Sequence, residues 1–75
     1  MPASQPNVPN TSRQRLEAKE SSILDAAEQV FTRAGFDGAK IATIAQTAAV
    51  AEGTVYLYYR NKQDLLAGVV GRFWA

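Results

Sequence analysis

The chain has 75 residues, a net charge of +1, and neither cysteine nor histidine. This length allows one small domain with a thin margin of stability. The missing residue types exclude disulfides and most zinc sites and remove the usual general base at neutral pH, so we expect no enzyme, no cofactor and no metal site.

The first segment, residues 1–11, contains all three prolines and no charged side chain. It has too little apolar surface to offset the entropy of ordering, so we expect a disordered tail followed by one domain over residues 12–75. No apolar run is long enough for a secretory signal or a membrane span. These features predict a cytoplasmic protein with no membrane contact.

The first helix is predicted for residues 13–35. Its apolar residues recur at the period of one buried helical stripe, and Gly35 is a suitable residue to end it. Phe36 is then expected to fold back onto the helix that precedes it. The stripe comprises Ile23, Ala27, Val30, Phe31 and Ala34.

Three shorter helices follow a turn at residues 37–38. Asn61 is expected to cap the last of them. Residues 41–59 contain enough β-branched side chains for strands to be considered, but no run alternates for long enough. The fold class is therefore all-α, a three-helix helix-turn-helix (homeodomain-like) bundle with the start of a fourth helix. The three shorter helices are predicted at residues 40–48, 53–59 and 62–74.

The second and third helices have the lengths and the short connection of a helix-turn-helix. Tyrosine and threonine hydroxyls can donate to phosphate oxygens, and a leucine can contact a thymine methyl group. Val55 and Tyr59 are predicted to face inward. The outward side of the third helix carries these chemical types and so favours a DNA groove: it presents Gly53, Thr54, Leu57 and Tyr58, with Tyr56 on the flank.

These motifs resemble a known family. The segments ILDAAEQVFTRAGFDG, GTVYLYY and NKQDLL resemble, in content and order, the N-terminal DNA-binding domain of TetR-type bacterial repressors over roughly residues 21–70. The resemblance implies sequence-specific binding to double-stranded DNA, with residues 52–58 in the major groove of a palindromic operator. It implies phosphate contacts from Tyr56, Tyr58 and Lys62. The other residues expected at the DNA are Lys40, Ala42, Thr43, Glu52, Gly53, Thr54 and Leu57.

Three places depart from the family pattern. Ala39 and Lys40 stand where a capping threonine or serine is usual, and a missing cap costs about 1 kcal/mol. Ala49 stands where the turn usually has glycine, which costs roughly 1 kcal/mol if the backbone there is left-handed. Ala51 and Glu52 replace a serine and a basic residue, so Glu52 bears directly on base preference.

TetR-type repressors continue into a helical C-terminal domain that binds a small ligand and forms the dimer. This sequence stops within its fourth helix, so we expect either a fragment or a chain without the sensing half. The intact protein is expected to be a homodimer released from DNA by a small-molecule inducer, and the chain alone a monomer. Apolar residues near the end are then expected to form an interface to the missing domain: Val69, Val70, Phe73 and Trp74.

Two alternatives stay open at this point. Arg13, Arg15 and Lys19 form either a solvated helix face, which we favour, or an arm into the minor groove. The whole domain is either a DNA-binding module or, as the second hypothesis, a protein–protein interaction module on the same scaffold, because a fold does not fix a function.

Overall fold

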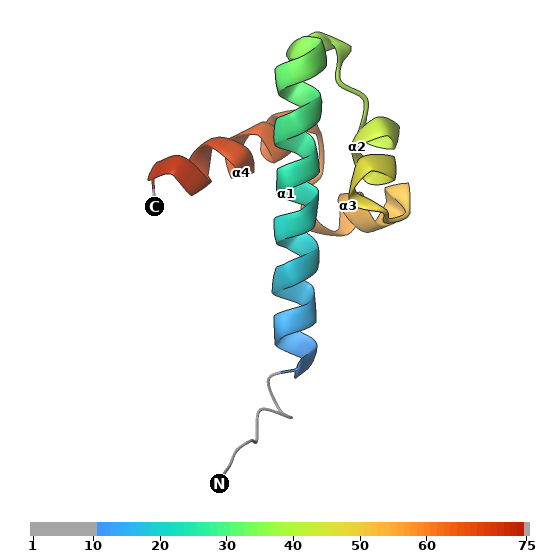
Figure 1. Cartoon of the computed structure of the whole chain (residues 1–75), viewed down its shortest axis with the longest axis vertical. Coiled ribbons are helices and arrows are strands. Elements are labelled where there is room, and N and C mark those ends of the chain that lie inside the picture. Colours follow the sequence, from blue (N-terminus) through green and yellow to red (C-terminus); the bar gives the residue numbers. More distant parts are fainter. Residues whose placement is uncertain (1–10, 75) are drawn as a thin grey trace, which may run out of the picture.

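The computed structural model describes residues 11–74, which form four helices (Figure 1). Most of the expected tail, residues 1–10, and Ala75 lie outside this part of the chain. The described residues include no strand, so the all-α prediction is confirmed, and none of their helices has the length and apolar character to cross a membrane. The helices are α1 (Thr11–Gly38), α2 (Ile41–Ala48), α3 (Glu52–Tyr58) and α4 (Lys62–Trp74).

The long helix α1 is the axis of the fold. In Figure 1, α2 and α3 lie on one side of it and α4 lies on the other, while its first turns extend beyond α3. The apolar residues of α1 explain this arrangement, because α2 and α4 both bury side chains against them. The core consists of Ile23, Leu24, Ala26, Ala27, Val30, Ala39, Ile41, Ile44, Ala45, Val55, Leu65 and Val69.

The end of α1 differs in detail from the prediction. Gly35 has φ 75° and ψ 170°, which interrupts the regular helix where it was expected to stop, but one more helical turn follows through Gly38. Phe36 does fold back, because its ring stacks on that of Phe31 with centroids 5.8 Å apart. Ala34 is exposed rather than buried. The predicted stripe continued to Ala34 on periodicity alone, whereas the packed part of α1 ends earlier.

The turn between α2 and α3 has the geometry of a helix-turn-helix. Ala49 adopts φ 62° and ψ 40°, the left-handed conformation that the sequence raised as a condition. This conformation lets the N–H of Val50 donate to the carbonyl of Ala45 at 2.9 Å, which closes the helix end. Val50 is half-buried and packs against the core. The turn therefore accepts local strain at an alanine in order to set the angle of α3.

The connection from α3 to α4 is set by two residues. Tyr59 was predicted as the last residue of the third helix but is extended, with φ −139°, although its N–H still donates to Val55 at 2.9 Å. Asn61 caps α4 as predicted, since its Oδ1 accepts from the N–H of Asp64 at 2.8 Å. The predicted bounds of α4 are confirmed.

Candidate nucleic-acid interface

The outer side of α3 is open to solvent. Leu57 is 83% exposed and Tyr56 48% exposed, and Glu52 and Gly53 are exposed as well. Val55, on the opposite side, is 0% exposed and fixes the helix to the core. A helix of seven residues is too short to be stable alone, so this buried side determines which residues point outward.

Gly53 has no packing role within the described residues. A Cβ atom built at this position would meet no other atom within 4 Å. Glycine at a helical position costs roughly 1 kcal/mol relative to alanine. No neighbour within the described part of the fold therefore requires glycine at this position. A partner that approaches the helix closely from outside would require it, and the cost is a less stable helix.

The N-terminal part of α2 presents the second group of predicted site residues. Lys40, Ala42 and Thr43 are all exposed. Lys40 occupies the N-cap position in an extended conformation, and no side chain caps the helix there. The expected loss of a cap is thus confirmed, and the ammonium group of Lys40 remains in solvent.

The tyrosines divide into three situations. Tyr56 is exposed on the flank of α3. Tyr58 is half-buried against the core, and its hydroxyl donates to the carbonyl oxygen of Leu16 over a long 3.4 Å. Tyr59 packs inward as predicted, with its hydroxyl donating to Glu20 Oε2 at 2.6 Å. Burial, followed by the bond to Glu20, raises the pKa of Tyr59 well above its ordinary value of 10.0.

Lys62 is held by the end of α1. Its Nζ donates to the carbonyl oxygen of Phe36 at 2.7 Å and to that of Asp37 at 3.4 Å, and it lies 4.6 Å from the centroid of the Phe36 ring. An ammonium group has three N–H donors, so one remains for an outside acceptor. Lys62 therefore has a structural role that the sequence did not reveal, and its phosphate contact stays a prediction.

The described ion pairs all lie outside α2 and α3. No ion pair between residues in the 11–74 range includes a side chain from either helix. Glu52 and Lys40 are therefore both free to interact with a partner. The ion pairs are Arg13–Glu17, Arg60–Asp64, and Arg72 with both Asp25 and Glu28.

A hollow beside α3 contains residues that sequence reasoning did not connect. Leu16 and Lys19 of α1 line it together with Thr54, Leu57 and Tyr58. Contacts between residues this far apart in the chain leave no local signal. The one usable clue was that Arg15 and Lys19 are four apart and so share a face of the first helix.

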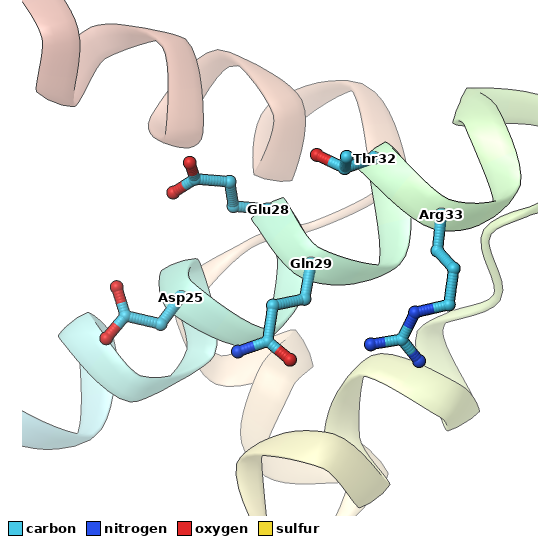
Figure 2. A pocket seen from close by; sticks show the side chains of 5 residues that line it. All are labelled: Asp25, Glu28, Gln29, Thr32 and Arg33. Carbon is cyan, nitrogen blue, oxygen red and sulfur yellow. The ribbon is translucent and has the colours of Figure 1, made fainter.

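A different hollow, of about 550 Å³, is lined by α1 alone (Figure 2). Its five side chains spread apart rather than converge, and Asp25 and Glu28 are bound by Arg72. A small-molecule site normally encloses its ligand and directs several polar groups toward it. This surface does neither, so α3 remains the candidate functional face. The lining residues are Asp25, Glu28, Gln29, Thr32 and Arg33.

Comparison with known proteins gives a consistent set of relatives. Residues 23–69 match the model of a family described as bacterial regulatory proteins, tetR family. The fatty acid metabolism regulator protein of Bacillus subtilis is 44% identical over 48 residues, which cover 64% of this chain and 25% of that protein. The transcriptional repressor BepR of Brucella suis is 37% identical over 62 residues, covering 80% and 30%.

A third relative is the transcriptional repressor KstR of Mycolicibacterium smegmatis, 33% identical over 54 residues that cover 72% of this chain and 26% of KstR. The chain thus matches 25% to 30% of the length of these three relatives. No solved structure matches it significantly.

Proposed function

The chain belongs to the tetR family of bacterial regulatory proteins, and from this membership we propose that it is the DNA-binding domain of a transcriptional regulator. The observation that carries the proposal is the outer face of α3. Leu57 is 83% exposed on a helix whose opposite side is held in the core by the fully buried Val55. A large apolar side chain held at the tip of a helix-turn-helix is suited to contact bases in a major groove.

Residues 52–58 would enter the groove in this proposal. Leu57 contacts a thymine methyl group and Thr54 a base edge or phosphate. Gly53 lets the backbone approach the duplex, which its empty surroundings support. Glu52 is repelled by phosphate, so it is expected to face a base and accept from the amino group of cytosine.

Phosphate contacts would fix the register of the helix on the duplex. Tyr56 is exposed and ready for such a contact, and Lys40, the N-cap residue of α2, supplies charge next to the exposed Ala42 and Thr43. Tyr58 and Lys62 are already engaged with α1. They would therefore contact phosphate while keeping these internal bonds.

The intact regulator is proposed to be a homodimer on a palindromic operator, with one such domain per half-site about one helical turn apart. Release by a small-molecule inducer and a cytoplasmic location are part of the same proposal. Repression is favoured over activation because two of the three relatives described above are named as repressors.

Binding should be tested by fluorescence anisotropy with a labelled duplex across a range of salt concentrations. The chain is expected to bind with an affinity that falls steeply as salt rises, because phosphate contacts release counterions. Leu57→Ala should weaken binding. Phe73→Ala removes a similarly exposed side chain from α4 and should leave binding unchanged. Absence of binding at low salt, even for two copies linked as a dimer, would exclude the proposal.

A protein-interaction module is the second candidate. It is favoured by the exposed apolar end of α4, where Val70, Phe73 and Trp74 are 43%, 69% and 83% exposed. The same titration separates the candidates, because a module of this kind would show no salt-dependent affinity for DNA.

A further inference from the structure

The first turns of α1 lie against the helix-turn-helix. Lys19 lines one hollow with Thr54 and Leu57 of α3. It also lines another, together with Arg15, beside the turn at Ala48, Ala49 and Val50. The two hollows thus place Lys19 of α1 beside both the turn and the outer face of α3.

Two tyrosines at the end of α3 reach this part of α1. The hydroxyl of Tyr58 reaches the carbonyl of Leu16, and that of Tyr59 reaches Glu20, one helical turn further along α1. Residues 13–19 are nevertheless exposed. They form an accessible surface next to α3, and Figure 1 shows the start of α1 continuing beyond α3.

The charges of this segment are unequally satisfied. Glu17 pairs with Arg13 at 3.6 Å, and Glu20 accepts the hydroxyl of Tyr59. Arg15 and Lys19 have no carboxylate partner within residues 11–74. Like charges four residues apart on a helix repel each other, so this pair weakens α1 unless an anion lies between or beside them.

From this geometry we infer that Arg15 and Lys19 are a second phosphate-binding site, which grips the DNA backbone next to the bases that α3 contacts. The inference rests on the proposed function, because the site borders the same face. A phosphodiester backbone fits the charge of the site and carries a regular row of anions along any duplex whose groove holds α3. This inference goes beyond the solvated helix face that the sequence favoured for these residues.

The experiment uses the full chain and a labelled duplex, with anisotropy measured at several salt concentrations. A plot of log affinity against log salt has a negative slope, and the double variant Arg15→Gln/Lys19→Gln should make it less steep by about two units. Each lost phosphate contact removes about 0.9 from its magnitude. The loss should be similar for all duplex sequences. Arg13→Gln is the matched control, because it removes a paired charge from the same segment and should leave the slope unchanged.

Charge-conserving exchange provides the rescue. Arg15→Lys/Lys19→Arg should keep the wild-type slope, and circular dichroism should show the same helix content in every variant. An unchanged slope in the glutamine variant, with wild-type binding intact, overturns this site and leaves the proposed function standing. Loss confined to one sequence overturns it too, because the residues would then contact bases. Failure of the wild-type chain to bind any duplex overturns both.

Discussion

Lys62→Met separates the two roles of the lysine that begins α4. The change keeps most of the apolar stem and removes the ammonium group, which now donates to Phe36 at 2.7 Å and to Asp37 at 3.4 Å beside an aromatic ring. A charged hydrogen bond contributes about 1.5–3 kcal/mol and an exposed cation–π contact about 0.5–1 kcal/mol. Lys62 is only half-buried, so water replaces part of both interactions.

The expected loss in the free energy of unfolding is therefore about 1–2 kcal/mol, or about 5–15 °C in melting temperature for a domain of this size. Thermal unfolding followed by circular dichroism measures it. Lys40→Met is the matched control, since it removes the same charge from an exposed side chain that caps nothing. If the two variants were equally stable, the contacts of Lys62 with α1 would contribute nothing, and any effect on DNA affinity would be purely electrostatic.

Three further predictions concern the glycines, the turn and a tyrosine. Gly53→Ala should raise stability by up to about 1 kcal/mol and weaken DNA binding, whereas Gly68→Ala should cost about 1–3 kcal/mol because its Cβ would lie 2.9 Å from the Tyr59 ring; equal thermal stabilities would refute this contrast. Ala49→Gly should stabilise the fold by about 0.5–1 kcal/mol in urea unfolding, since relief of left-handed strain exceeds the added entropy of the unfolded chain, and a loss of stability would mean that the strain is absent. Because the pKa of Tyr59 is raised in the fold, the folded state keeps its proton where the unfolded state loses it, so stability should fall as pH rises above 10.0. Tyr59→Phe should lack that part of the fall, and parallel stability–pH curves would contradict the raised pKa of Tyr59, which burial causes first and the bond to Glu20 second.

The elements that local rules describe could be predicted from the sequence. The four helices follow from apolar periodicity, and the start of α4 follows from Asn61, whose capping bond is present. The inward position of Val55 follows from the 100° rotation per residue, whereas Tyr59 packs inward although its backbone is extended and not helical. Ala34 shows the limit of periodicity. An apolar stripe indicates which face of a helix can be buried, but not how far along the helix a neighbouring helix covers that face.

The contacts of the candidate site that join distant residues could not be predicted. Lys62 was expected to contact phosphate, and nothing in the sequence indicated that it also reaches a carbonyl 26 positions earlier in the chain. Tyr58 was assigned to the duplex, yet its hydroxyl reaches Leu16, which is 42 positions away. Lys19 shares a helix face with Arg15, but nothing in the sequence placed that face beside Leu57. Each contact depends on the angle between helices, which is set by packing of the whole core and not by any local pattern.

The helix-turn-helix is weakly stabilised by its own residues and depends on α1. Neither α2 nor α3 has a side-chain N-cap, and the turn between them contains a left-handed alanine. Val55 and the hydroxyls of Tyr58 and Tyr59 supply the missing restraint, the latter two at successive turns of α1. Because these contacts help to orient α3, a shift of α1 is expected to move α3 as well. A duplex held by both helices would thus oppose any movement that separates them.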